Sequence, residues 1–263
     1  MKDFIADGWQ QILDGNSLDS FEALWTLDIG WFEAPNKRRG GWSGVSRCDL
    51  EVPGGGSVGV FVKRQQDHVY RSPRHPLRGM LTFAREFENL QHYRSLGIPT
   101  LEPLYFAVRK VDGQRRAILV TRELAGYASL DRCVEYWQAE GFPGMSQRRE
   151  LIAQLAAVAA RLHRHHLQHN CFYPKHIFIG DEDGRADIRI IDLEKTKWRL
   201  SKTRASLRDL DTLNRHSPDW SRTDRLRFLL AYHEQPHVDA QVRKTWNRLV
   251  ALMHKKGRSM TGP

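Results

Sequence analysis

The first 120 residues contain four short apolar runs that are paired by turn residues. Glycines 54–56 separate the first two runs, and Asp112-Gly113 separates the other two. Apolar runs of this length, bounded by Gly, Pro and Asp, are typical of strands joined in β-hairpins. We therefore predict two hairpins, with strands at residues 46–52, 58–63, 104–108 and 117–120.

A helical pattern lies between the two hairpins. Phe83, Phe87 and Leu90 recur at three- and four-residue spacing, and the pattern ends near Gly97. Thr82 precedes the first of these residues and is expected to act as the N-cap. The pattern predicts a helix between the two hairpins, and it places Glu86 on that helix.

Three segments of the same half have no clear period. We expect a short helix and a lead-in strand in residues 1–35, and a flexible turn in residues 39–46. The stretch 66–80 contains Pro73 and Pro76 among His and Arg residues, and we expect it to form an irregular basic insert.

Helical periodicity dominates the second half. After a helix over residues 130–139, Ser146 and Glu150 are expected to open a long buried helix, and further helices are predicted at 207–213, 221–232 and 238–254. The less apolar segment that follows Thr121 marks a boundary between residues 1–122 and 123–263. The fold class is therefore α+β, with an antiparallel β lobe followed by a mainly helical lobe.

Composition indicates an ordinary globular protein. The chain has 263 residues and is 40% hydrophobic, which is enough to bury a substantial core. It shows no bilayer-spanning apolar run and no signal-peptide pattern, so we expect a cytoplasmic protein. Cys48, Cys133 and Cys171 form no C-x-x-C motif, and we expect reduced thiols rather than disulfides or a cysteine-rich zinc site.

The net charge of +10 and the pI of about 9.7 suggest a partner of opposite sign. Nucleic acid, an anionic membrane and a phosphorylated substrate would each provide the opposite charge. The alternative is a soluble basic surface with no specific ligand. Lys and Arg are spread along the chain, and no nucleic-acid motif is present. Nucleic acid is therefore not expected as a partner. The oligomeric state stays open.

The most chemically dense stretch runs from His169 to Glu194. Asp192 ends an apolar run, so its carboxylate is expected at a strand tip, where side chains can face a cleft. Four histidines, His163, His165, His166 and His169, lie near the end of the long predicted helix. They could bind zinc, but without a carboxylate or cysteine at ligand spacing the pattern favours a simple interaction with the helix dipole.

Two features of the first half are ambiguous when taken alone. Lys63 ends an apolar strand, and its ammonium group could act on a ligand or merely extend to solvent. Clustered glycines could bring backbone N–H groups close to a phosphate or could serve only as turn residues.

The order of these features resembles that of protein-kinase-like folds. More closely, it resembles the bacterial lipopolysaccharide core kinases, the Kdo and heptose (WaaP-type) kinase family, in its InaA-like branch. The resemblance runs from about Gly40 to Tyr232. The segments that carry it are Val60-Phe-Val-Lys63, Arg85-Glu86, Tyr173-Pro-Lys-His176-Ile-Phe, Ile191-Asp192-Leu-Glu-Lys195 and Asp209-Leu-Asp211.

The resemblance implies a bilobal fold that uses ATP and Mg²⁺. Lys63 would contact the ATP phosphates, Glu86 would orient Lys63, and Asp192 would bind the metal. His176 takes the place of a metal-binding asparagine. Glu194 is a second candidate metal ligand, or else a surface partner of Lys195 or Lys197. The resemblance also implies nucleotide contacts at Gly40, Gly41, Gly44, Glu123 and Leu124.

One position departs from the kinase pattern. Aligning His169 with the catalytic-loop histidine places Cys171 where kinases carry the aspartate that accepts the hydroxyl proton. A thiol cannot replace that carboxylate, and a neutral cysteine beside Phe172 and Tyr173 is typical of a small packed residue. His169, Cys171, His176 and Asp192 are therefore the candidate catalytic residues, with the identity of the base open.

The expected activity is phosphorylation of a sugar hydroxyl, with heptose of the lipopolysaccharide inner core as the acceptor. The expected partners are the core glycolipid and the anionic inner-membrane surface, to which the protein would bind peripherally on the cytoplasmic face. The alternative is a catalytically impaired pseudokinase or a stress-associated nucleotide-binding module, which Cys171 favours.

Overall fold

The structure, a computed structural model, describes residues 3–38, 40–72, 75–182 and 184–255. The chain divides into two compact units. Unit 1 comprises residues up to Ser95 together with Leu101–Ala125, and unit 2 comprises Leu96–Thr100 and the chain from Gly126 onward. The division thus falls three residues after the predicted boundary, and it assigns the short segment after α3 (Thr82–Ser95) to unit 2.

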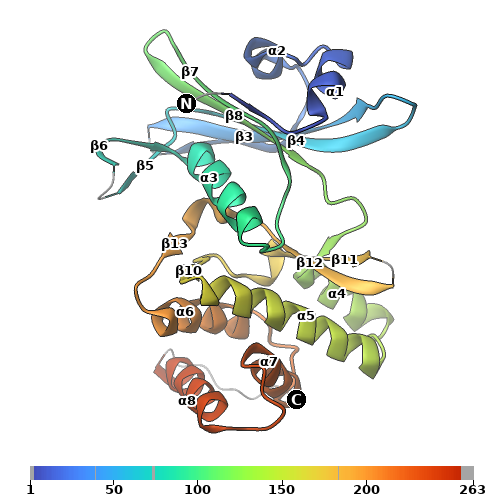
Figure 1. The fold of residues 1–263 in the computed structure, drawn as a ribbon, viewed down its shortest axis with the longest axis vertical. Helices are drawn as coiled ribbons and strands as arrows, with labels where there is room; N and C mark the ends of the chain where they lie inside the picture. The colour runs from blue at the N-terminus through green and yellow to red at the C-terminus, as the bar shows by residue number, and fades with distance from the viewer. Residues whose placement is uncertain (1–2, 39, 73–74, 183, 256–263) are drawn as a thin grey trace. The chain divides into compact units, whose positions relative to one another are not determined.

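Unit 1 is built on a six-stranded antiparallel sheet with the order β1-β7-β8-β4-β3-β2 (Figure 1). The strands are β1 (Phe4–Ile5), β2 (Trp31–Arg38), β3 (Gly41–Glu51), β4 (Ser57–Gln66), β7 (Pro103–Val111) and β8 (Gln114–Arg122). Both predicted hairpins are confirmed as β3–β4 and β7–β8. Asp112 and Gly113 have φ angles of 51° and 81°, the left-handed pair that a two-residue hairpin turn needs.

Two expectations for unit 1 are wrong, and a third is incomplete. Where one short helix and a strand were expected, the described N-terminal residues form two helices, α1 (Trp9–Gly15) and α2 (Phe21–Thr26), before strand β2 begins at Trp31. The expected basic insert contains a hairpin, β5 (Val69–Ser72) with β6 (His75–Leu81). The expected flexible turn at 39–46 is already strand β3 from Gly41 onward. Cross-strand pairing decided the last two segments, and the local pattern did not show it.

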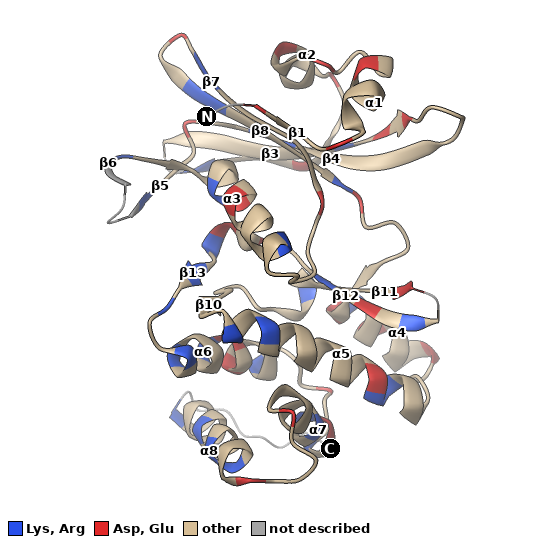
Figure 2. Ribbon diagram, in the orientation of Figure 1, with Lys and Arg blue, Asp and Glu red and all other residues tan. Residues whose placement is uncertain are grey.

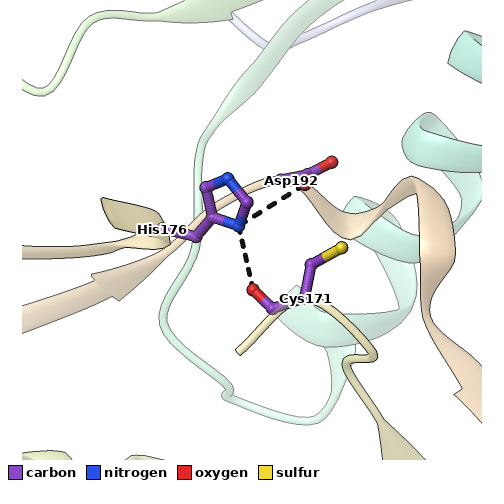
Figure 3. Close-up of side chains that lie close together, drawn as sticks. All are labelled: Cys171, His176 and Asp192. Atoms are coloured by element: carbon purple, nitrogen blue, oxygen red, sulfur yellow. Dashed lines mark hydrogen bonds and ion pairs between the residues drawn. The ribbon is translucent and has the colours of Figure 1, made fainter. Parts of the chain in front are cut away.

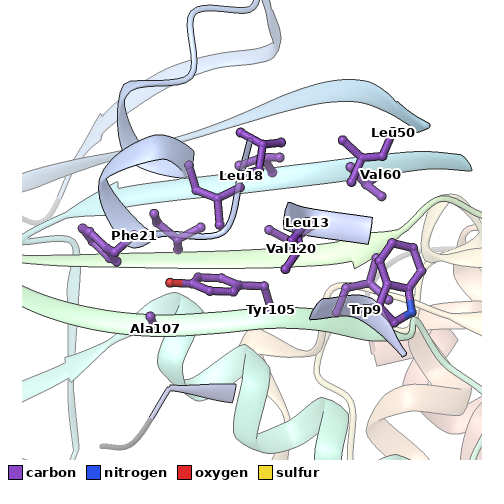
Figure 4. Close-up of a cluster of buried hydrophobic side chains, with 13 residues drawn as sticks. Trp9, Leu13, Leu18, Phe21, Leu50, Val60, Tyr105, Ala107 and Val120 are labelled. Atoms are coloured by element: carbon purple, nitrogen blue, oxygen red, sulfur yellow. The ribbon is translucent and has the colours of Figure 1, made fainter. Parts of the chain in front are cut away.

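A hydrophobic core lies between the sheet and the first two helices (Figure 4). Trp9, Leu13 and Phe21 pack against Val60 and neighbouring residues of the sheet. Val60 and Val62 are fully buried on this face, whereas Phe61 and Lys63, at alternate positions, lie on the opposite face. Burial of each large apolar side chain contributes roughly 1.5–3 kcal/mol, so the aperiodic N-terminal segment helps to hold the sheet.

Helix α3 covers the opposite face of the sheet (Figure 1). Phe87 of α3 stacks on Phe106 of β7 with ring centroids 4.3 Å apart. Leu90 and Tyr93 follow on the same helix and are fully buried. The apolar period predicted from the sequence therefore faces the sheet, and it sets the rotation of α3 about its axis.

Unit 2 is mainly helical. Its helices are α4 (Leu130–Glu140), α5 (Met145–Arg164), α6 (Lys202–Arg215), α7 (Arg222–Tyr232) and α8 (Ala240–Lys255). All five predicted helices are confirmed, although α5 begins after Gly144 without a side-chain cap, so Ser146 does not cap it. Ser221 and Asp224 form a reciprocal capping box at the start of α7.

Short strands connect the helices of unit 2. They are β9 (Ala128–Ser129), β10 (Leu167–Gln168), β11 (Ile177–Glu182), β12 (Arg185–Ile190) and β13 (Lys197–Trp198), with 3-10 turns η1 (Pro174–His176) and η2 (Leu193–Lys195). The hairpin β11–β12 is tied to the segment before β7, because Thr100 Oγ1 donates to the Ile190 carbonyl at 2.6 Å. These strands place the chemically dense stretch at the end of α5.

Within the described residues, every helix is too short or too polar to cross a lipid bilayer.

Candidate active site

Lys63 and Glu86 form an ion pair in unit 1. Lys63 Nζ lies 2.5 Å from Glu86 Oε1, and the two side chains are 16% and 5% exposed. Lys63 projects from the face of β4 that α3 covers, and Glu86 lies one turn into α3. A charged hydrogen bond shielded from water is strong and directional, so Glu86 fixes where the ammonium group points.

Gln65 caps the helix that carries Glu86. Its Oε1 accepts hydrogen bonds from Thr82 Oγ1 at 2.8 Å and from the Phe83 N–H at 2.7 Å. Its Nε2 donates to the His68 carbonyl, and His68 Nδ1 contacts Thr82 Oγ1. The expected N-cap role of Thr82 is therefore wrong, because the acceptor comes from β4. Gln65 is two residues after Lys63, on the same face of the strand.

The three predicted phosphate-loop glycines lie around the turn between β2 and β3. Gly40 has a φ of 81°. A Cβ on Gly41 would clash with the Gln66 carbonyl, and one on Gly44 would lie 2.6 Å from the Trp31 ring. Close packing thus requires glycine at two of the three positions. Protein kinases place a glycine-rich loop over the ATP phosphates, and this role stays a prediction here.

Glu123 and Leu124 follow β8 at the end of unit 1. The Glu123 carboxylate accepts two hydrogen bonds from Arg47, at 2.9 and 2.8 Å. Its N–H donates to the Gly59 carbonyl at 2.9 Å. The carboxylate and the backbone N–H of Glu123 are therefore both hydrogen-bonded within unit 1. Any nucleotide contact of this segment is left to its remaining backbone groups and to Leu124, which is half-buried.

A buried carboxylate holds the loop that carries Cys171. Asp209 of α6 accepts hydrogen bonds from the His169 N–H at 2.6 Å and from the Asn170 N–H at 2.9 Å. Its Oδ2 also lies 3.3 Å from His163 Nε2. Asn170 has a φ of 65°, and two backbone bonds to one rigid carboxylate stabilise this left-handed conformation.

His169 links this loop to the segment before Asp192. Its Nε2 donates to the Ile191 carbonyl at 3.0 Å, and its Nδ1 accepts from the Cys171 N–H at 3.2 Å. Burial lowers the pKa of His169 to about 4, so the ring is neutral near pH 7. Since both ring nitrogens are bonded to backbone groups, this geometry suits positioning better than proton transfer.

Cys171, His176 and Asp192 converge in unit 2 (Figure 3). His176 Nδ1 lies 2.9 Å from the Cys171 carbonyl and 3.4 Å from Asp192 Oδ2. Asp192 follows β12 by two residues and has a φ of 61°, which Asp tolerates better than most residues. Its side chain is 30% exposed, so the carboxylate lies near a strand end and reaches solvent.

The environment keeps the thiol of Cys171 protonated. The residue is only 5% exposed. Burial, and to a lesser extent the Asp192 carboxylate, raise the pKa of Cys171 to about 11. Burial also lowers the pKa of His176. Near pH 7 the site therefore contains a neutral thiol beside a neutral imidazole, and Asp192 is its carboxylate.

Glu194 does not share a strand face with Asp192. Asp192 precedes the 3-10 turn η2, which contains Glu194, so the expected strand geometry is wrong. Glu194 Oε1 lies 3.7 Å from Lys195 Nζ, which is the alternative pairing expected for Glu194.

Lys195 is charged although it is partly buried. Burial opposes the charged form of Lys195, but the neighbouring acidic groups outweigh this effect and raise the pKa of Lys195. Lys195 thus adds a positive charge next to Cys171 and Asp192, which the sequence pattern did not show.

The remaining clustered histidines serve local structure. His163 Nδ1 lies 3.0 Å from the Tyr232 hydroxyl, and His166 Nδ1 lies 2.9 Å from the Arg199 carbonyl. Among the described residues, the one group of three or more potential metal ligands is Cys171, His176 and Asp192. Among these residues, the four histidines near the end of α5 do not bring three such ligand atoms together.

Comparison with known proteins identifies the family. Residues 22–232 match the family described as "Lipopolysaccharide kinase (Kdo/WaaP) family". The chain belongs to this family. Protein InaA of Escherichia coli (strain K12) is 31% identical over 199 residues, which cover 75% of this chain and 88% of InaA. The predicted family and its InaA-like branch are confirmed.

The fold of this Kdo/WaaP family member is similar to that of a solved WaaP structure. The structure titled "WaaP in complex with acyl carrier protein" aligns with a TM-score of 0.66 at 22% identity, and the alignment covers 97% of this chain and 98% of that one. The structure titled "Crystal structure of Rad53 kinase domain and SCD2" aligns with a TM-score of 0.41 at 16% identity and covers 82% and 80%. The alignment with the WaaP structure confirms the predicted fold class, and membership of a kinase family supports phosphotransferase activity.

Proposed function

We propose that the protein is an ATP- and Mg²⁺-dependent kinase that phosphorylates a sugar hydroxyl of the lipopolysaccharide inner core, with heptose as the acceptor sugar. The observation that carries this proposal is the Lys63–Glu86 ion pair, with its 2.5 Å contact, in a member of the lipopolysaccharide kinase family. A lysine that only extended to solvent would not need a buried carboxylate partner.

Unit 1 would supply the phosphate contacts. Phosphoryl transfer depends mainly on positioning and on neutralising charge at the phosphates. Lys63 carries the charge, Glu86 fixes its direction, and Gln65 fixes the helix on which Glu86 lies. The backbone around Gly40, Gly41 and Gly44 and the segment at Glu123 and Leu124 would complete the nucleotide contacts.

Unit 2 would supply the metal and acceptor contacts. Mg²⁺ binds proteins through one or two carboxylates and keeps several waters, and the partly exposed Asp192 fits that requirement. His176 lies beside it, and Glu194 remains the proposed second carboxylate. When bound, Mg²⁺ neutralises charge on the phosphate oxygens. His169 and Asp209 hold the loop backbone in place.

The residue at the usual position of the proton acceptor is Cys171. The pKa of Cys171, at about 11, leaves the thiol unable to act as a base near pH 7. Loss of a general base typically costs about a hundredfold to ten-thousandfold in rate. We propose Asp192 as the acceptor, because it is the nearest carboxylate to Cys171 in the cluster. The neutral thiol also favours a second candidate, a nucleotide-binding module with little or no turnover.

A basic, partly apolar surface supports action on a membrane glycolipid. The basic segment, residues 195–204, contains five Lys or Arg residues and no acidic residue, and Figure 2 shows cations in β13 and along α6. Trp198 is 57% and Leu200 is 83% exposed. Cations around exposed aromatic and aliphatic side chains suit an anionic membrane surface. We propose peripheral binding to the cytoplasmic face of the inner membrane through this segment.

The deciding experiment measures γ-phosphate incorporation from ATP into purified core glycolipid. We expect activity in the parent, and a loss of about a hundredfold or more in Lys63→Ala and in Asp192→Asn. Lys110→Ala, at an exposed position of β7, is the control and should retain activity. ATP binding without transfer to any core acceptor would exclude the kinase and support the nucleotide-binding module.

A further inference from the structure

Cys171, His176 and Asp192 offer three different kinds of donor atom in one place. The sulfur, an imidazole nitrogen and a carboxylate oxygen all lie within 4.8 Å of one another. The three residues come from the loop after β10, from η1 and from the turn after β12 (Figure 3). The kinase pattern has an aspartate at the cysteine position. The substitution therefore adds a sulfur donor where kinases have an oxygen.

We propose that this cluster binds a thiophilic divalent metal ion of the Zn²⁺ class, with the Cys171 sulfur as a direct ligand. The inference concerns the site of the proposed function, and it gives that site a metal other than Mg²⁺. As the metal–sulfur bond forms, the Cys171 thiol would release its proton to solvent. The ion would be held by three protein ligands and would keep an open coordination position.

The donor chemistry supports this metal class. Mg²⁺ requires an octahedral set of oxygens, whereas thiolate and imidazole ligands favour Zn²⁺, Co²⁺ and similar ions. Three mixed ligands with a free fourth position are typical of open zinc sites. Bound to the same carboxylate and imidazole, such an ion would compete with Mg²⁺. In the proposed kinase it would therefore act as an inhibitor.

The geometry requires only small side-chain movements. Zn–S and Zn–N bonds are about 2.3 and 2.1 Å, which places the ligands of a tetrahedral site roughly 3.3–3.8 Å apart. The present separations, up to 4.8 Å, exceed this by about an ångström. The partly exposed Asp192 side chain can rotate to close the gap. Nδ1 of His176 contacts both the Cys171 carbonyl and Asp192, and it would exchange these contacts for the metal ion.

The surrounding contacts fix the ligands in place. Asp209 binds the backbone of the two residues before Cys171, and His169 bridges Cys171 to Ile191, the residue before Asp192. Such contacts around a metal site orient the ligands and raise metal affinity. A cysteine that only filled space would not require a histidine and a carboxylate at ligand distance.

The test is a titration of the metal-free full-length protein with Co²⁺, followed by absorption spectroscopy. We expect a thiolate-to-cobalt charge-transfer band that saturates at one equivalent and disappears when Zn²⁺ is added. Cys171→Ser should abolish the band and weaken Zn²⁺ binding at least about a hundredfold. Cys133→Ser is the control, because Cys133 is a partly buried thiol that lies outside the cluster, and it should behave as the parent.

Two further variants extend the test. Cys171→Asp should lose the band and bind Mn²⁺ more tightly, because it replaces sulfur by oxygen. Asp192→Asn keeps a residue that tolerates the left-handed backbone, and it should weaken Co²⁺ binding while retaining the charge-transfer band. No band in the natively folded parent, or a band that persists in Cys171→Ser, would overturn the inference. Unchanged Co²⁺ affinity in Asp192→Asn would also overturn it, even if the cysteine variants failed to fold.

The two proposals can fail separately. The Co²⁺ titration needs neither ATP nor an acceptor, whereas the transfer assay is run with Mg²⁺ and chelator-treated protein. A cobalt band without phosphoryl transfer would leave the metal site standing and remove the kinase. Phosphoryl transfer without a cobalt band would support the kinase and overturn the proposed thiophilic metal site.

Discussion

His169 is a buried side chain that organises a loop through its two ring nitrogens. Both ring nitrogens bond to backbone groups, one on each side of the cluster that contains Cys171. The residue is completely buried, and this burial has a measurable consequence for the pH dependence of stability.

We predict that His169 makes the protein less stable at mildly acidic pH. Burial lowers the pKa of His169 from 6.5 to about 4, so between these values the unfolded state binds a proton that the folded state does not. The stability present above pH 6.5 is lost as the pH falls towards 4. From pH 7 to pH 5 this amounts to about 2 kcal/mol.

Urea unfolding at pH 7 and pH 5, with a chelator present, measures this effect. His169→Asn should be less stable at pH 7 but should lose about 2 kcal/mol less on acidification. His92→Asn, at an exposed position of α3, should keep the pH dependence of the parent. Equal pH dependence in His169→Asn and the parent would contradict this prediction.

At the scale of elements, β4 and α3 together position the Lys63–Glu86 ion pair. Lys63 and Gln65 lie on the same face of β4, and one pairs with Glu86 while the other caps the helix that carries Glu86. The position of the ion pair therefore depends on how the helix begins.

We predict that Gln65→Ala destabilises the protein and lowers phosphoryl transfer. The change leaves the buried Phe83 N–H without its acceptor, at a cost of roughly 1–3 kcal/mol. Gln66→Ala is the control, because the neighbouring Gln66 faces the other way and bonds only to Arg116 among the hydrogen bonds described. Urea unfolding and the transfer assay should separate the two variants. Equal behaviour would show that the cap does not position Glu86.

The basic segment is a second element with a testable role. The Trp198 ring stacks on the His166 ring with centroids 5.7 Å apart. The Leu200 side chain is mostly exposed. We predict that the double change Trp198→Ala and Leu200→Ala weakens co-sedimentation with phosphatidylglycerol vesicles about tenfold or more, because apolar side chains enter the interface. Tyr136→Ala removes an aromatic ring that is 64% exposed on α4, and should have no effect. If it weakened binding equally, the segment would not be the contact.

At the scale of the whole molecule, net charge governs association. The chain carries a formal charge of +10, and each Lys or Arg near an anionic surface contributes about 1 kcal/mol. We predict that binding to anionic vesicles falls steeply between low salt and 1 M salt, where the screening length shortens from about 30 Å to about 3 Å. Neutral phosphatidylcholine vesicles should bind weakly at every salt concentration. Salt-independent binding would contradict an electrostatic mechanism.

Much of the fold and of the candidate site could be predicted because periodic patterns are local. The hairpins, α3 and the helices of unit 2 follow from apolar spacing, since one face of each element must be buried. The second of the two N-terminal helices and the β5–β6 hairpin were missed. Their stability comes from packing and pairing with distant strands rather than from their own period.

The sequence by itself determined which residue types are present and in what order: Lys63, Glu86, the loop from His169 to His176, and Asp192. Only the tertiary structure decided which of them meet. It brought Gln65 to the start of α3 and Asp209 to the His169 loop, it turned Glu194 away from a shared strand face, and it set the Cys171 sulfur beside Asp192 and His176. The physical reason is that spacing along one element fixes side-chain direction over a few residues, whereas contacts between elements depend on how whole surfaces pack.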